Sequence, residues 1–506
     1  MSVWRIMFRK ALVCLVALLL VLSGCGSNSN VAPQDRVLIV GTHTTPSTLD
    51  LSANDAAAIS EALLYNVYQT LVRTDDQGQL QKLLASDYQI SSDRKTYTFT
   101  LRPGAKFSSG APVNAEAVVK SINYIINDEN TSKTRKKEMA VVDSVEAKDS
   151  DTVEFKLKRP SNFWLYSMAG PAGVIYDPAA LDSGDLATQP VGSGPYKLDT
   201  WLQGEEIRLI RDPGYWGTPA RVAGVNFKYF ADPNAMNNAM ASGSIDIIRN
   251  VTAPQALGQF EKNDQYKVLE GYTNGEVVLG MNQQRELLKD LRVRQAINYA
   301  IDRQALLDAV WAGKGTLIGS MVPPFEPWFE DLSDAYPYNP EKAKELLAEA
   351  GYGDGLTLTM RVPTLPYATD SAAYISSVLS QVGITLNIEQ LEFPARWIDE
   401  VMVKSNYDLT IVSHVEPRDI VRFATPDYYW HFDNEELRQV MAQADQSPEP
   451  EQIELLKKAA RIISDQAGAD FLWLLPNLVV TKPEIVGISS NATNLSFDLT
   501  NVAINE

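Results

Sequence analysis

The sequence has little cysteine and little histidine, and these shortages exclude several classes of protein. The chain has two cysteines and three histidines among 506 residues, and the histidines at 43, 414 and 431 show no metal-ligand spacing. The motifs HExxH and GxSxG, which mark zinc and serine hydrolases, do not occur. We therefore predict a protein that is not an enzyme and that carries no cofactor.

Blocks of positive charge and long apolar runs are also missing. The chain holds 63 acidic and 45 basic side chains, with a formal net charge of −18, so it is poorly suited to binding nucleic acid. After residue 22, no apolar stretch approaches the roughly 20 residues that a membrane-spanning helix needs. This composition fits an exported protein whose main body lies in water.

The N-terminus has the parts of a secretory signal peptide. Three basic residues between positions 5 and 10 precede the apolar run 11–22, which is too short for a stable membrane anchor. The tetrapeptide "LSGC" that ends at Cys25 resembles the lipobox of bacterial lipoproteins, in which the cysteine is acylated and becomes the first residue. An ordinary signal peptide followed by a chance cysteine is the alternative.

From these features we predict a lipoprotein held at the cell membrane on its extracytoplasmic face. Residues 1–24 would be removed as the signal peptide, Cys25 would carry palmitate or similar chains, and residues 25–35 would form a flexible tether. Since one acyl chain binds a membrane only marginally, more than one would be needed. The mature chain then keeps one blocked thiol and forms no internal disulfide, so its stability must come from a buried core.

The pattern of strands and helices predicts an α/β fold with two lobes. Strand signals such as 37–41 and helix signals such as 55–72 fill a mixed first lobe, residues 36–270. A long helix at 290–311 opens a second lobe, residues 271–475, where strands and helices alternate. Residues 476–506 return to short strands typical of the first lobe. A chain that crosses and returns makes a two-strand hinge, which permits closure around a ligand.

Two helix starts carry specific signals. Asn114 precedes a run with helical spacing and is predicted to cap it, and Asn339 with Pro340 marks a second start that Gly351 would end.

Six segments resemble one protein family in order and in spacing. They are "TLDLSANDAAAISEALLYNVYQTLVRTDDQGQLQKLLASDY", "YTFTLRPGAKFSSGAPVNAEAVVKSI", "VGSGPYKL", "IRLIRDPGYWG", "LLKDLRVRQAINYAID" and "YNPEKAKELLAEAGY". Together they are similar to family 5 extracellular solute-binding proteins, the oligopeptide, dipeptide and nickel group that serves ABC importers. Small departures are Ala117, where the family usually has Asp, and Ser193, where it usually has Thr.

The resemblance implies a type II periplasmic-binding-protein fold, with an accessory subdomain in the first lobe, and a role in import. A monomer would capture short peptides between two lobes and deliver them to an ABC permease and its ATPase. Within the family, nickel chelates, opines or other non-peptide solutes are alternative ligands, and a receptor for a signalling peptide is an alternative role.

The stretch "YDLTIVSHVEPRDIVRF", residues 407–423, holds the main candidate site residues. The family's ammonium-binding Asp falls on Pro417 here, so either Glu416 or Asp419 replaces it or the protein does not capture a free α-amine at this position. His414 stands where relatives often place Trp and could line the cavity with its ring. Arg418 is the best local partner for a ligand carboxylate, because its planar guanidinium matches one. A solvated loop whose charges merely neutralise one another is the alternative.

Four further residues are predicted to face the same cleft by analogy with the family. Thr45 and Ser47 follow the first strand, and Tyr367 could pack on the ligand. Trp430, in the aromatic stretch "DYYWHF", could form a wall of the pocket or pack inside the second lobe.

Overall fold

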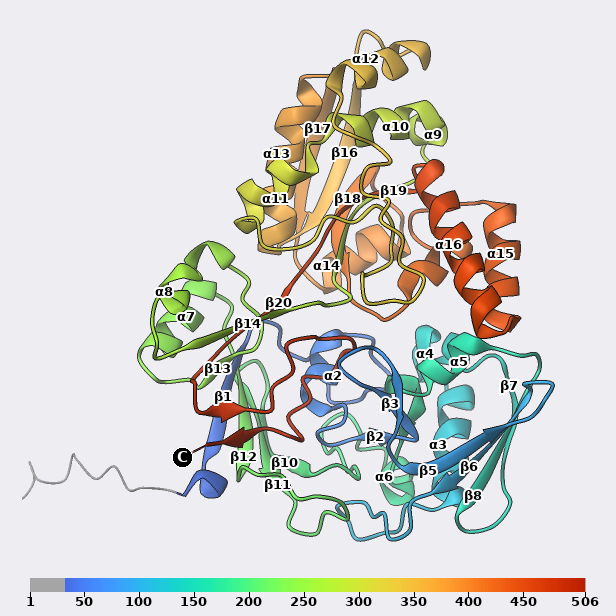
Figure 1. Cartoon of the computed structure of the whole chain (residues 1–506), viewed down its shortest axis with the longest axis vertical. Coiled ribbons are helices and arrows are strands. Elements are labelled where there is room, and N and C mark those ends of the chain that lie inside the picture. The colour runs from blue at the N-terminus through green and yellow to red at the C-terminus, as the bar shows by residue number, and fades with distance from the viewer. Residues whose placement is uncertain (1–31, 506) are drawn as a thin grey trace, which may run out of the picture.

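The computed structural model describes residues 32–505 and has two lobes built around separate sheets (Figure 1). The predicted signal peptide, Cys25 and most of the predicted tether lie outside the described residues. Within residues 32–505, none of the helices combines the length and the apolar character that a bilayer crossing requires.

Lobe I is centred on a seven-stranded sheet that mixes parallel and antiparallel pairs. Its strands, in spatial order, are β10 (Tyr196–Leu202), β11 (Glu206–Arg211), β12 (Gly224–Tyr229), β1 (Val37–Thr42), β13 (Ile247–Ile248), β20 (Asn477–Thr481) and β14 (Lys267–Gly271). Strand β1 runs parallel to β12 and begins with Val37 opposite Gly224. Helices α7 (Pro233–Ala241) and α8 (Gly258–Glu261) bury Met236 and Phe260 in a cluster beside this sheet.

The accessory part of lobe I is a four-stranded antiparallel sheet packed against one long helix. The strands are β5 (Ala85–Ile90), β6 (Thr96–Leu101), β8 (Thr152–Leu157) and β7 (Val142–Ala147), and the helix is α3 (Ala115–Asn127). The Asn114 side chain accepts a hydrogen bond from the backbone N–H of Ala117 at 2.9 Å, which confirms the predicted helix cap.

Short elements complete lobe I. They are η1 (Pro33–Asp35), α2 (Ala57–Leu63), β2 (Gln69–Thr70), β3 (Val72–Thr74), β4 (Leu80–Lys82), α4 (Lys133–Glu138), α5 (Asn162–Ser167), η2 (Pro171–Gly173), β9 (Val174–Ile175), α6 (Pro178–Ser183), η3 (Pro254–Ala256), β21 (Ile485–Val486) and β22 (Ala503–Ile504). The helix predicted over 55–72 covers seven residues only, because Tyr65 turns the chain with a positive φ of 64°. Val67 and Leu71, which carried the helical spacing onward, are buried in the segment that follows the turn.

Lobe II is a five-stranded sheet with helices packed around it. The strands, in order, are β17 (Ile384–Leu391), β16 (Leu356–Pro363), β18 (Leu409–His414), β15 (Glu276–Met281) and β19 (Ala469–Leu474). The helices are α9 (Glu286–Lys289), α10 (Leu291–Ala300), α11 (Arg303–Trp311), α12 (Pro340–Glu349), α13 (Pro366–Ser380), α14 (Ala395–Trp397), the π-helix η4 (Ile398–Val403), η5 (Asp419–Ala424), α15 (Glu435–Gln446) and α16 (Glu449–Asp465).

The single helix predicted over 290–311 is two helices, α10 and α11. Ile301 has an extended backbone, and the Asp302 side chain accepts a hydrogen bond from the N–H of Ala305, so that a new helix begins there. The cap predicted at Asn339 is confirmed, since its side chain accepts from the N–H of Lys342 at 3.0 Å.

Two chain segments join the lobes side by side. Gly271 pairs with Asn477 at the edge of the lobe I sheet, and Glu276 pairs with Leu474 at the start of the lobe II sheet. Between them, the N–H of Leu475 donates to the carbonyl of Gly275 at 2.8 Å. This is the expected two-strand hinge, and we propose that these two crossings delimit the predicted ranges 36–270, 271–475 and 476–506.

Candidate functional site

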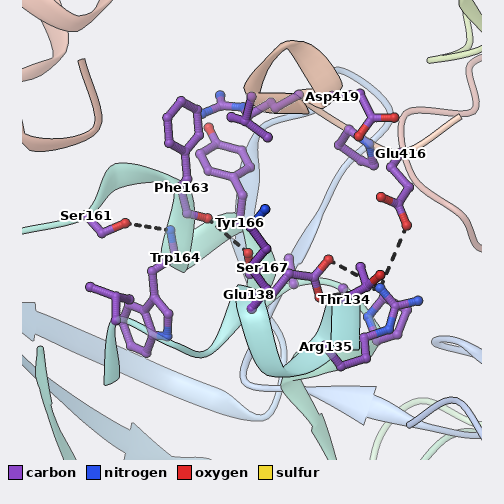
Figure 2. Close-up of a pocket in the computed structure, with 18 of the residues that line it drawn as sticks. Thr134, Arg135, Glu138, Ser161, Phe163, Trp164, Tyr166, Ser167, Glu416 and Asp419 are labelled. Carbon is purple, nitrogen blue, oxygen red and sulfur yellow. Dashed lines mark hydrogen bonds and ion pairs between the residues drawn. The ribbon is translucent and has the colours of Figure 1, made fainter. Parts of the chain in front are cut away.

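A cavity of about 600 Å³ lies between the two lobes. Its lobe I wall comes from α4, α5 and the segment that follows β8, and its lobe II wall comes from the turn after β18, η5 and the end of α15. Residues 494 and 495, on the returning chain, complete the lining. In Figure 2, Arg135 and Glu138 of lobe I lie across from Glu416 and Asp419 of lobe II.

Two of the predicted acids meet at one arginine on the lobe II wall. Glu416 and Asp419 both accept hydrogen bonds from the guanidinium of Arg422, with Asp419 Oδ1 3.2 Å from its Nε. The opposite charges of Asp419 and Glu416 outweigh burial and raise the pKa of Arg422. The stretch predicted as either a solvated loop or a cavity lining therefore forms a charged cluster at the cavity.

Arg418 also lines the cavity, and its guanidinium already has partners. It stacks over the ring of Tyr166 in lobe I, 3.3 Å from the ring centroid, and lies 4.5 Å from the ring centroid of Trp328 in lobe II. Its Nη2 pairs with Glu326 Oε2 at 3.5 Å, while its buried Nε has no hydrogen-bond partner among residues 32–505. Arg418 thus links the two lobes through an aromatic stack.

His414 lies behind the cavity wall, among buried groups. Hydrogen bonds join its Nδ1 to Asp419 Oδ2 at 3.1 Å and its Nε2 to the Tyr429 hydroxyl at 2.9 Å. The imidazole is nearly parallel to the Tyr429 ring and is 8 % exposed. It positions Asp419 and is not among the residues that line the cavity.

The other predicted contacts lie away from this cavity. Thr45 and Ser47 are exposed, whereas Trp430 is fully buried and stacks on Phe423 with 4.2 Å between ring centroids. The Tyr367 hydroxyl accepts a hydrogen bond from the backbone N–H of Ser413 at 2.9 Å. None of the four predicted residues lines the cavity, and their contact with a ligand stays a prediction.

The sequence analysis missed the buried arginine of the lobe I wall. Arg135, on α4, is 2 % exposed and has carboxylate oxygens of Glu138, Asp55 and Glu416 within 3.3 to 3.8 Å. Burial raises the pKa of Glu138 to about 7, although the charge of Arg135 opposes this shift. In the sequence, "KTRKKE" is a run of charges typical of a solvated helix, so its pattern gives no sign that one arginine is buried.

A second link between the lobes involves Asp445, at the end of α15. Its Oδ1 accepts hydrogen bonds from the Ser161 hydroxyl at 2.8 Å and from the N–H of Phe163 at 2.9 Å, and its Oδ2 pairs with Arg159. In return, the Asn162 amide donates to the carbonyls of residues 444 and 447. The carboxylate therefore satisfies an N–H at the start of α5, while the amide satisfies carbonyls at the end of α15. Figure 1 shows α5 of lobe I next to α15 and α16 of lobe II.

The described part of the chain offers no protein-built metal centre. Among residues 32–505, no three His, Cys, Asp or Glu side chains are grouped so that they could hold a metal ion.

The family model for bacterial extracellular solute-binding proteins, family 5 Middle, matches residues 79–419. The glutathione-binding protein GsiB of Escherichia coli K12 is 31 % identical over 401 residues, which cover 77 % of this chain and 75 % of that protein. GsiB of Salmonella typhimurium LT2 is 32 % identical over 375 residues, or 72 % of this chain and 70 % of that one.

Solved structures share the fold at lower identity. DppA of Helicobacter pylori, in complex with the peptide STSA, superposes with a TM-score of 0.84 at 22 % identity, covering 94 % of this chain and 99 % of that one. AgaA of A. tumefaciens R10, in complex with agropinic acid, superposes with a TM-score of 0.83 at 23 % identity, covering 93 % and 99 %. With the hinge and the cavity between the lobes, these matches confirm the type II fold, and the chain belongs to the family 5 extracellular solute-binding proteins of ABC importers.

Proposed function

We propose that the protein captures short peptides in the cavity between its lobes and delivers them, chemically unchanged, to an ABC permease with its ATPase. The observation that carries this proposal is the cavity itself, which has peptide dimensions and charged groups on both walls. The curated relatives bind glutathione, which is a tripeptide, and the DppA structure holds the peptide STSA. The protein would act as a monomer anchored at the cell membrane through a lipidated Cys25.

Of the two predicted acids, Glu416 is the better partner for a ligand's α-amine. Both oxygens of Asp419 are engaged, one with Arg422 and one with His414. Glu416 Oε2 accepts a hydrogen bond from Arg422, while Glu416 Oε1 is 3.8 Å from Arg135 Nη1, beyond hydrogen-bond distance. Among the described residues Glu416 therefore keeps an acceptor that an ammonium can use, and it replaces the acid that Pro417 displaces.

A thermal-shift screen of purified protein lacking residues 1–25 tests the proposal. A ligand that prefers the folded, closed state raises the free energy of unfolding by RT ln(1 + [L]/Kd), so a mixture of di- to pentapeptides should raise Tm. No shift with peptides, together with a shift from nickel–histidine or an opine, would reverse the assignment. The fold alone is compatible with either, since NikZ of Campylobacter jejuni holds Ni(L-His) and AgaA holds agropinic acid in similar structures.

Substitution of the two acids tests where the amine binds. We expect Glu416→Ala to weaken free-amine peptides about tenfold or more, since a charge-assisted hydrogen bond contributes about 1.5–3 kcal/mol, and to leave N-acetylated peptides unchanged. Asp419→Ala should weaken both sets alike, because this carboxylate positions His414 and Arg422. If Glu416→Ala weakens free-amine and N-acetylated peptides equally, Glu416 is not the residue that binds the α-amine.

Labelling with palmitate tests the anchor. Cells that express the full chain should incorporate the label, and Cys25→Ser should abolish it and release the protein from the membrane fraction. Label retained in the Cys25→Ser protein would show that the acylated residue lies elsewhere.

A further inference from the structure

Most of the charged side chains that line the cavity form ion pairs within the protein. Each of the four carboxylates of the lining has an arginine within 4 Å: Glu138 has Arg135, Glu416 and Asp419 have Arg422, and Asp445 has Arg159. The remaining arginine of the lining, Arg418, pairs with Glu326. All of these charges therefore have partners within the protein.

Two further cations line the cavity, and both belong to lobe I. Lys137 Nζ donates to the Thr425 hydroxyl across the cavity at 3.3 Å, and Lys158 Nζ donates to the carbonyl of Ala140 at 2.8 Å. Both partners are neutral, and within residues 32–505 neither lysine has a carboxylate within 4 Å. The lining thus carries six cationic and four acidic side chains, and the two lysines, both solvent-exposed, have no carboxylate partner among the described residues. The protein as a whole has a formal net charge of −18.

The two lysines belong to one corner of the lobe I wall. Lys137 lies near the end of α4, and the N–H of Ala140 donates to its carbonyl at 3.2 Å. Lys158 places its ammonium on the carbonyl of that same Ala140, and its backbone N–H donates to the carbonyl of Val141 at 2.9 Å. The Lys158 amine is therefore held at residue 140 of the lobe I wall, whereas the Lys137 amine reaches across to Thr425 of lobe II.

The surroundings of Lys137 also favour an anionic ligand. Burial and then the positive charge of Arg422 lower the pKa of Lys137, against the weaker opposite effect of Asp427. A ligand carboxylate at this position would relieve that unfavourable environment. Neither lysine would have to break an internal ion pair in order to bind it.

We infer that the site selects acidic peptides, with the amine of the ligand at lobe II and a side-chain carboxylate at Lys137 and Lys158 of lobe I. This inference rests on the proposed peptide-binding function and adds a substrate class and an orientation to it. A ligand held in this way pairs with opposite charges on the two lobes, so its binding favours the closed arrangement.

Matched peptides and matched variants test the inference by calorimetry. Ala-Glu-Ala should bind the protein on the order of tenfold more tightly than Ala-Gln-Ala at 0.15 M salt, and the ratio should shrink at higher salt. Lys137→Gln with Lys158→Gln should bring the ratio close to one. It should change binding of Ala-Gln-Ala little.

Lys136→Gln with Lys156→Gln is the control, since it removes the same charge from neighbouring positions that do not line the cavity. It should keep the preference for glutamate. If wild-type protein binds both peptides equally, the acidic selectivity is wrong and the peptide function stands. If both double variants lose the preference alike, the effect is long-range charge, and the lysine site is wrong. If neither peptide binds, both the proposed peptide-binding function and this inference are wrong.

Discussion

The contact at Asp445 predicts how much of the binding affinity depends on closure. Asp445→Ala removes two hydrogen bonds to a carboxylate, from the Ser161 hydroxyl and the Phe163 N–H, and one ion pair with Arg159. The arginine side chain is 49 % exposed, so the ion pair contributes less than about 1 kcal/mol. In the open state all of these groups are free to bind water.

The expected magnitude follows from the two hydrogen bonds. Bonds to a charged acceptor contribute about 1.5–3 kcal/mol each when buried, and replacement by water in the open state recovers part of this. We expect Asp445→Ala to reduce the free energy that favours the closed state by about 2 kcal/mol. This corresponds to about a 30-fold increase in Kd when the ligand-free protein is mostly open. The increase should appear in the dissociation rate, because the contact forms only after the ligand is enclosed.

Stopped-flow and calorimetric measurements with one peptide would check this prediction. Glu436→Ala is a suitable control on the same helix, since Glu436 pairs with Lys458 within lobe II and should leave Kd within about twofold of wild type. A Kd for Asp445→Ala within that same range would refute the view that this contact stabilises the closed form. A lower Tm in the ligand-free variant would instead assign Asp445 to the fold of the lobes.

Two predictions concern pH. Burial first, and then the charge of Glu416, raise the pKa of Glu138 to about 7 against the opposite effects of Arg135 and Arg422. As pH falls from 8 to 6, protonation of Glu138 removes a negative charge from the cavity, so an acidic peptide should bind more tightly. Glu138→Gln should flatten this pH profile. An unchanged slope in the variant would show that Glu138 is not the titrating group. Burial also raises the pKa of Asp470 from 3.8 to about 6, so the folded state binds this proton more tightly than the unfolded state does. The contribution of this proton to the free energy of unfolding is present below about pH 4 and lost as pH rises through about 6. Urea unfolding of Asp470→Asn should not show this loss. An equal loss of stability in the variant would contradict the prediction.

The sequence was most informative where one segment determines its own structure. Caps at Asn114 and Asn339 follow from local hydrogen bonding, and both are present. The helix predicted across 301 and 302 failed, because the apolar spacing of α10 and α11 continues through a break that Asp302 creates by capping the second helix. Periodicity reports which side chains are buried, and it does not distinguish one helix from two that share a core.

The site was harder to predict, because it consists of contacts between distant segments. Family spacing led to residues 416–419, and all four of them line the cavity. The burial of Arg135 depends on Asp55 and Glu416, which are far from it in sequence. The role of Asp445 likewise depends on the accessory part of lobe I, so no local pattern could identify it.

A crystal structure of the protein with Ala-Glu-Ala would test the central claim most directly. It should place the peptide in the cavity between the lobes, with its ammonium within hydrogen-bond distance of Glu416 and its glutamate carboxylate beside Lys137 and Lys158. A peptide bound in the reverse direction would contradict the assigned orientation. A peptide bound outside the cavity would contradict the account as a whole.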